Sequence, residues 1–253
     1  LFRRDKKEHT VKEMLLSILL LPLAAVLHPS LGEDYSGIVS DLTEEMKTEI
    51  LDNFNAVRRG VQPTASNMVK MTWSERAAET AEIWIRKCQP KRFPRDERMV
   101  DGILCGETRM QATYTLSWSE VINTWNKKAS NFQYGVGAIN TNINIYFYTQ
   151  MIWYNSHKVG CSLAFCNDNK YEFVYVCLYC PVGNIAEKVA TPYKEGPSCE
   201  DCPHSCENKL CTQPCEYYDE NVYCEQMIRL FACEHKVMQD MCKATCRCPS
   251  GIM

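Results

Sequence analysis

The sequence has 253 residues, of which 16 are cysteine, and its formal net charge at pH 7 is −3. The hydrophobic fraction of 45% is that of a globular protein, which excludes general disorder. So many cysteines are unusual where thiols stay reduced, and their even number suits disulfides in an oxidising compartment. Because the pI is near 6.0, we expect no nucleic acid as a partner.

The N-terminal segment contains an apolar stretch of 13 residues from Leu15 to Leu27, which is too short to span a bilayer. A buried helix is the alternative, but Pro22 and the lack of periodicity count against it. Small residues follow, which is typical of a secretory signal peptide. We therefore predict that residues 1–32 are an upstream segment and signal peptide, cleaved near Gly32, and that the protein is secreted into the extracellular space without a membrane span.

The cysteines form two groups, with six between positions 88 and 180 and ten between positions 199 and 248. The segment between them, 183–198, contains the prolines and glycines typical of a linker. The last segment, of about 50 residues, is too small to be stable through an apolar core alone. We therefore expect disulfides to stabilise the second part and a hydrophobic core to stabilise the first.

Three helices are predicted in the first part. Asp41 is a candidate N-cap for a helix with Glu44 at its third position and apolar residues at helical spacing up to Val57. Ser74 is a candidate cap for the second helix, and 117–120 (SWSE) is a capping box that opens the third.

Three later segments, 144–154, 160–165 and 171–179, are rich in β-branched and aromatic residues and predict strands. Helices followed by strands indicate an α+β protein with helices packed on an antiparallel sheet. We interpret all five tryptophans as core residues: Trp73, Trp84, Trp118, Trp125 and Trp153.

Five ordered segments match a known family: 52–59 (DNFNAVRR), 63–71 (PTASNMVKM), 105–107 (CGE), 148–154 (YTQMIWY) and 175–184 (YVCLYCPVGN). The last ten cysteines add the spacing Cx2Cx3Cx4Cx3Cx8Cx8Cx8Cx3CxC. Over essentially all of 42–253 the chain resembles the cysteine-rich secretory proteins, within the group that includes antigen 5 and plant pathogenesis-related 1 proteins. In its tail it looks most like the mammalian epididymal and testicular members.

The resemblance implies a three-layer α-β-α sandwich, a hinge and a small disulfide-rich helical domain that is similar to sea-anemone potassium-channel toxins. We expect the sandwich at 33–182, the linker and disulfide hinge at 183–214, and the cysteine-rich domain at 215–253. Spacing alone leaves the pairing open. The resemblance implies the pairs Cys88–Cys166, Cys105–Cys180, Cys161–Cys177, Cys199–Cys206, Cys202–Cys211, Cys215–Cys248, Cys224–Cys242 and Cys233–Cys246.

The wider family has a cleft with two histidines and two glutamates, which binds zinc in some members. Compared residue by residue, this sequence keeps only Glu107, and Arg92, Lys128 and Phe147 take the other three positions. Zinc needs imidazole, carboxylate or thiolate ligands, so we predict no metal and no cofactor. We expect Glu107 to pair with Arg92 or Lys128, because a buried carboxylate usually has a charged partner.

No catalytic constellation is visible in the sequence. His157, His204 and His235 lie in separate segments, and no G-x-S-x-G motif provides a nucleophile. With every cysteine expected in a disulfide, no thiol is left for catalysis. We therefore predict that the protein is not an enzyme and has no catalytic residues.

A secreted binding protein is the leading functional hypothesis. The resemblance implies a protein of the male reproductive tract that binds sperm or egg surface components in sperm maturation or fertilisation, with 167–175 corresponding to an egg-interaction segment of relatives. The expected partner is a cell-surface or membrane protein.

Two alternatives remain. The C-terminal domain could regulate an ion channel, with Tyr223, Arg229, Phe231 and Lys236 as candidate partner-binding residues, since aromatic and arginine side chains anchor interfaces. An acidic run, Glu216, Asp219 and Glu220, weakens a pore-plugging role. The other alternative is lipid or sterol binding by the first domain.

Overall fold

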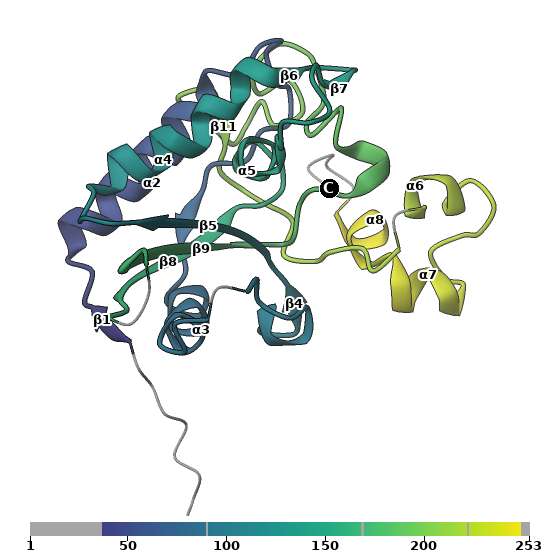
Figure 1. The fold of residues 1–253 in the computed structure, drawn as a ribbon. Helices are drawn as coiled ribbons and strands as arrows, with labels where there is room; N and C mark the ends of the chain where they lie inside the picture. The colour runs from purple at the N-terminus through teal and green to yellow at the C-terminus, as the bar shows by residue number, and fades with distance from the viewer. Residues whose placement is uncertain (1–36, 90, 168–169, 222, 249–253) are drawn as a thin grey trace, which may run out of the picture. The chain divides into compact units, whose positions relative to one another are not determined.

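A computed structural model of the chain describes residues 37–89, 91–167, 170–221 and 223–248 (Figure 1). The predicted signal region, 1–32, lies outside the described residues. The helices are α2 (Glu44–Arg59), α3 (Glu75–Ile85), α4 (Trp118–Asn126), α5 (Tyr146–Met151), α6 (Cys224–Met227), α7 (Lys236–Met241) and α8 (Lys243–Arg247), with 3-10 turns η1 (Asp96–Arg98), η2 (Lys127–Asn131) and η3 (Ala186–Lys188). The strands are β1 (Ile38–Ser40), β2 (Thr72–Trp73), β3 (Met99–Val100), β4 (Ile103–Leu104), β5 (Gly106–Ala112), β6 (Phe132–Gln133), β7 (Gly137–Ala138), β8 (Lys158–Phe165), β9 (Phe173–Cys180), β10 (Cys206–Glu207) and β11 (Leu210–Cys211).

A five-stranded sheet forms the middle layer of the first domain. Its strand order is β1-β8-β9-β5, and β2 lies parallel to the start of β8. Strand β9 pairs antiparallel with β8 and with β5. All residues of β9 after Phe173 are buried, because helices cover both faces of the sheet. This two-sided burial explains the uninterrupted apolar stretch in the sequence of β9.

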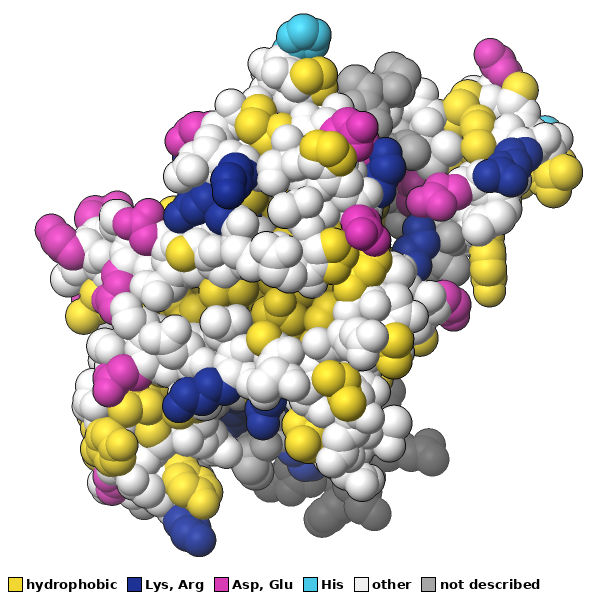
Figure 2. Space-filling model, turned by 90° about the horizontal axis from the view of Figure 1, so that it is seen from above, with side chains coloured by type: hydrophobic (Ala, Val, Ile, Leu, Met, Phe, Trp, Pro, Cys, Tyr) yellow, Lys and Arg dark blue, Asp and Glu magenta, His cyan; other side chains and the backbone are white. Residues whose placement is uncertain are grey.

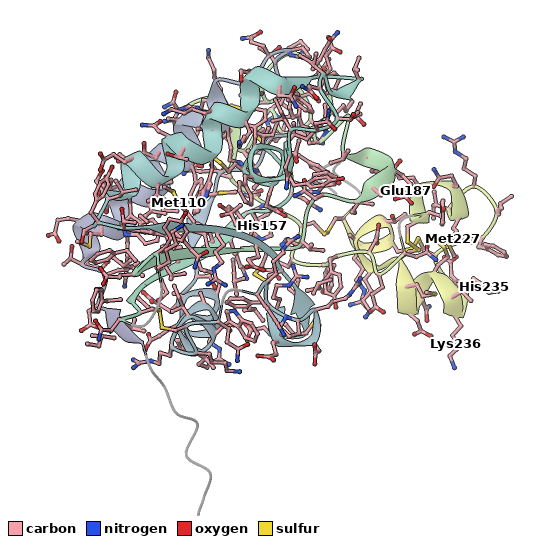
Figure 3. All side chains as sticks on the ribbon, in the orientation of Figure 1. Met110, His157, Glu187, Met227, His235 and Lys236 are labelled. Carbon is pink, nitrogen blue, oxygen red and sulfur yellow. A yellow bond between two sulfur atoms is a disulfide. The ribbon has the colours of Figure 1, made fainter. Side chains whose placement is uncertain are left out.

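The helices cover opposite faces of the sheet, with α2, α4 and α5 on one side and α3 on the other (Figure 1). Tyr175 and Tyr179 of β9 face the first set of helices, as does Met110 of β5 (Figure 3). Val176 and Leu178 face α3, as the two-residue period of a strand requires. The predicted α+β, three-layer sandwich is therefore confirmed.

Helix α3 lies very close to β8, and Gly160 allows this approach. A Cβ atom built on Gly160 would lie 2.1 Å from the backbone nitrogen of Ala78. No other residue fits without moving the helix, so this glycine sets the spacing between the two layers.

Two of the three predicted helix starts are confirmed. The Ser74 hydroxyl accepts the N–H of Ala77, and Ser117 forms a complete capping box with Glu120. For the first helix, the cap is Thr43 and not Asp41. The Thr43 hydroxyl accepts the N–H of Met46, three residues on, which is the geometry that a cap requires.

The predicted strand at 144–154 is wrong, since α5 occupies 146–151. The Asn144 side chain accepts the N–H of Tyr146, and this local turn starts the helix. The last four residues of α5 are all buried, so the segment shows no amphipathic helical period. Strand β5 was not predicted, because its sequence GETRMQA lacks a β-branched run; its pairing with β9 holds it in the sheet.

The hinge is fastened to the first domain by backbone hydrogen bonds. The N–H of Ser66 donates to Lys194 at 2.9 Å, the N–H of Lys70 to Cys211 at 2.8 Å, and the N–H of Cys211 to Met68 at 2.8 Å. We call 191–211 the hinge segment and 63–70 the docking loop. The composition predicts a linker, but this segment is bonded to the docking loop along its length.

Arg58 of α2 stabilises the region under the docking loop. The residue is 1% exposed. Its guanidinium donates to the carbonyls of Val69, Met151, Trp153 and Tyr154 at 2.7–2.8 Å. Burial lowers its pKa to about 9, and the four acceptors favour the charged form, so Arg58 remains a cation at neutral pH.

The C-terminal domain contains α6, α7 and α8 around a core of Cys224, Met238 and Cys242. Asp219 accepts the N–H of Thr245 at 3.0 Å and its hydroxyl at 2.6 Å, which orders α8. This small core depends on its disulfides, as expected for a domain of this size.

Candidate functional site

Glu107 is the only residue of the family's cleft set that this chain keeps. Its side chain is 1% exposed, on the face of β5 that is shared with Leu178 and covered by α3. Oε2 accepts the N–H of Phe93 at 3.2 Å and lies 3.8 Å from Nε of Arg92. Oε1 is buried and has no hydrogen-bond partner among the described residues. Burial raises the pKa of Glu107, against the lowering effect of nearby arginines.

Three arginines act on this carboxylate and a fourth acts on one of them, whereas the cleft comparison had identified only Arg92. Arg92, Arg98 and Arg109 each lower the pKa of Glu107 through their charge. Arg95 lies near Arg98. The pKa of Arg98 is lowered chiefly by burial and further by the charges of Arg92 and Arg95. We call these four residues the arginine cluster. The signal in the sequence was the density of basic residues in 86–98 (RKCQPKRFPRDER).

The structure does not bring the four cleft positions together. Arg92 lies beside Glu107, as one of the two expected pairings has it. Phe147 packs on the opposite side of the sheet, against the core formed by α2 and α4. Lys128 lies in η2 and forms no ion pair with any residue that the structure describes.

These residues do not fit a divalent metal. One carboxylate remains, and cations surround it, so a metal would gain a single ligand and meet repulsion. A second group of close donors, Cys199, Cys202 and Cys211, is also unsuitable. Its sulfurs are joined in the disulfides Cys199–Cys206 and Cys202–Cys211, and a disulfide sulfur does not provide a thiolate.

Eight disulfides use all sixteen cysteines, and none is free. They join the same partners as the pairing that the resemblance implies. Cys161–Cys177 links β8 to β9 within the sheet, whereas Cys88–Cys166 ties the end of α3 to the end of β8.

The candidate partner-binding residues lie at the surface of the C-terminal domain. Tyr223 is 56% exposed, Phe231 is 40% exposed, and Leu230, directly before Phe231 in the chain, is 78% exposed. His235 and Lys236 project from the end of α7 (Figure 3), and the ring of His235 lies 5.0 Å from that of Phe231. Hydrophobic side chains gather on this domain at the right of Figure 2. We call 228–231, with Tyr223 and 235–237, the apolar tip.

Acidic residues of the C-terminal domain are used within it. Asp219 bonds Thr245, and Glu220 pairs with Lys243 at 2.9 Å. Of this acidic run, only Glu220 has a cationic partner among the described residues, so the weight of the run against a pore-plugging role is only slightly smaller.

The three histidines in the described part of the chain do not form a catalytic group. His157 is buried, its Nδ1 lies 2.9 Å from the carbonyl of Asn155, and burial lowers its pKa. His204 and His235 lie in the hinge and the C-terminal domain. The described residues contain no helix that is long and apolar enough to cross a bilayer.

Comparison with known proteins agrees with this architecture. Residues 51–179 match the family described as "Cysteine-rich secretory protein family", and 199–253 match the one described as "Crisp". The chain therefore belongs to the cysteine-rich secretory protein family. Its eight disulfides and its membership of a secretory family fit an extracellular protein.

Solved structures share the sandwich fold at low identity. The crystal structure of NaASP2 with Zn2+ is 22% identical with a TM-score of 0.55, over 68% of this chain and 97% of that one. Hookworm platelet inhibitor is 21% identical with a TM-score of 0.54, over 68% and 93%. Schistosoma mansoni venom allergen-like protein 4 is 20% identical with a TM-score of 0.51, over 64% and 100%. The zinc belongs to the first of these proteins, and the residues described above do not reproduce a site for it.

Proposed function

We propose that this is a secreted, non-enzymatic protein that acts by binding a cell-surface or membrane protein through its C-terminal domain. The observation that carries the proposal is the apolar tip, where Leu230 and Phe231 are exposed on a domain held by three disulfides. Exposed apolar groups on a rigid frame lose little conformational entropy on binding, and aromatic and arginine side chains are common interface anchors.

The biological setting that we infer is the male reproductive tract, with a sperm or egg surface component as the partner. Family membership and the resemblance of the cysteine tail to epididymal and testicular members support this inference. In 167–175, which corresponds to the egg-interaction segment of relatives and of which 168–169 lie outside the described residues, Tyr175 is buried. Tyr171, whose ring centre lies 5.5 Å from the Lys170 ammonium, is therefore the better candidate for surface contact.

The experiment is binding of the labelled full-length protein to sperm and to eggs. We expect Leu230→Ala/Phe231→Ala to weaken binding at least tenfold, which is about 1.4 kcal/mol. Val136→Ala/Ile139→Ala is the matched control, because both side chains are exposed apolar groups of the first domain. Equal loss in both double variants, or unchanged binding in the first, would overturn the role of the apolar tip.

Ion-channel regulation is the second candidate. It is favoured by the exposed cations Arg229 and Lys236, which in the sequence flank the contacting rings of Phe231 and His235. A cation next to an aromatic ring suits the mouth of a cation pore. Patch-clamp recording with full-length protein tests it, and we expect Arg229→Gln/Lys236→Gln to abolish any current change. An effect that survives this substitution would contradict the hypothesis. Lipid or sterol binding, the third hypothesis, is favoured by no particular feature of the described residues.

A further inference from the structure

Five cations of the first domain lie near one another beside the buried Glu107, and we call them the strip. It contains Lys91 and the arginine cluster. Lys91 and Arg95 are exposed, and the Arg92 side chain is 73% exposed. Arg98 and Arg109 are half-buried and form the floor.

The strip has more cations than its own acids can neutralise. Its acids are Glu107, which is buried beneath Arg92, and Asp96, which is exposed. Five cations against two carboxylates leave a local charge of +3, whereas the whole chain has a net charge of −3. The neighbouring Lys87 and Glu97 pair with each other at 3.0 Å and add nothing to this excess. The region is therefore opposite in sign to the molecule.

The floor of the strip is fixed by backbone contacts. Arg98 donates to the carbonyl of Cys105 at 3.1 Å, and Arg109 donates to the carbonyl of Lys91 at 2.6 Å. Nε of Arg98 and Nε of Arg109 are buried without a hydrogen-bond partner among the described residues. Cys105 is tied to Cys180 by a disulfide, which anchors this end of β5 to β9. The positive charges are thus held together on a rigid support instead of dispersing into solvent.

We propose that this strip binds a sulfated polysaccharide chain of the glycosaminoglycan type. Guanidinium groups recognise tetrahedral oxyanions through paired N–H donors, and closely spaced arginines match closely spaced sulfates. A flat anionic membrane is a less suitable partner, because it would also face the acidic remainder of the molecule and be repelled by it. A narrow linear polyanion contacts the strip alone.

Heparin affinity of the full-length protein tests the proposal. Lys91→Gln/Arg95→Gln is the primary variant, because neither side chain forms an ion pair or hydrogen bond in the described structure and the fold should persist. Lys127→Gln/Lys209→Gln removes the same charge from exposed positions outside the strip and is the matched control. We expect the primary variant to bind heparin at least tenfold more weakly at physiological salt, and the control to change by less than about twofold.

Three ligands separate the possible sources of binding. Heparin should bind, desulfated heparin should bind at least tenfold more weakly, and vesicles with phosphatidylserine should not compete. The proposal is overturned if the unmodified protein does not retain heparin at physiological salt, if both double variants lose equally, or if desulfated heparin or the vesicles bind as well as heparin.

Discussion

Replacement of Arg58 by methionine should destabilise the first domain strongly. Methionine keeps much of the length and apolar stem of arginine but removes four hydrogen bonds to the carbonyls of Val69, Met151, Trp153 and Tyr154. A buried polar group without a partner costs about 1–3 kcal/mol. The loss is reduced because a buried charge is also removed, so we expect a decrease of about 3–5 kcal/mol in the free energy of unfolding.

The stability of Arg58→Lys should lie between that of Arg58→Met and that of the unmodified protein. An ammonium has three donors and a single centre, so it cannot reach all four carbonyls, and we expect a loss of about 1–3 kcal/mol. Arg59→Met is the control, because the side chain of this neighbouring arginine forms no hydrogen bond or ion pair with the described residues. The change should alter stability by less than about 0.5 kcal/mol.

The assay is equilibrium denaturation in guanidinium chloride with the disulfides intact, followed by tryptophan fluorescence. Thermal unfolding should show a decrease of roughly 6–20 °C for Arg58→Met. Hydrogen exchange should show faster exchange at the amides of Ser66, Lys70 and Cys211, since Arg58 supports the loop that binds them. A stability of Arg58→Met within about 1 kcal/mol of the unmodified protein would refute this reasoning.

Three further predictions concern the sheet and its titratable groups. Burial raises the Glu107 pKa above 4.5, so the free energy of unfolding should fall as pH rises through that raised pKa. Glu107→Gln should flatten this slope, and curves of stability against pH that stay parallel for the variant and the unmodified protein would contradict the prediction. Burial lowers the His157 pKa below 6.5, so the free energy of unfolding should fall as pH decreases below 6.5. His157→Gln should remove that part of the decline, which is measured by the denaturation midpoint at each pH. An unchanged decline in the variant would count against this prediction. Gly160→Ala places a methyl group against Ala78 and should lower the free energy of unfolding, measured by chemical denaturation, by about 3 kcal/mol. Gly60→Ala is the control and should be nearly neutral, because the nearest atom to its new methyl group is 3.4 Å away. Equal effects of the two substitutions would exclude close packing as the cause.

The sequence predicted the layers of the fold because its signals were local or repeated. Ser74 and Ser117 stand directly before helical periods, and β9 has a long apolar run between turns. Strand β5 and helix α5 were beyond this kind of reasoning. Their structures depend on pairing with β9 and on burial between layers, which are contacts between residues far apart in the chain.

The candidate site was predicted only in part for a related reason. The position of Arg92 beside Glu107 followed from the family comparison. Arg109 lies two residues after Glu107, on the same face of β5, and because β5 was not predicted its place beside Glu107 was missed. Net charge also concealed the arginine cluster, because an overall value of −3 averages it with acidic surfaces elsewhere. Local charge has to be judged after the fold has brought the residues together.

The fastening of the hinge segment to the docking loop decides where the molecule can be cut. The "Crisp" match begins at Cys199, yet Cys211 exchanges hydrogen bonds with Met68 and Lys70 of the first domain. A cut before Cys199 would break these hydrogen bonds and leave unpaired backbone groups on both the first domain and the C-terminal fragment. A cut after Cys211 leaves those bonds within the larger piece. We therefore expect domain exchange or protease cleavage to be tolerated after Cys211, the last cysteine of the hinge, and not within the proline- and glycine-rich stretch before it.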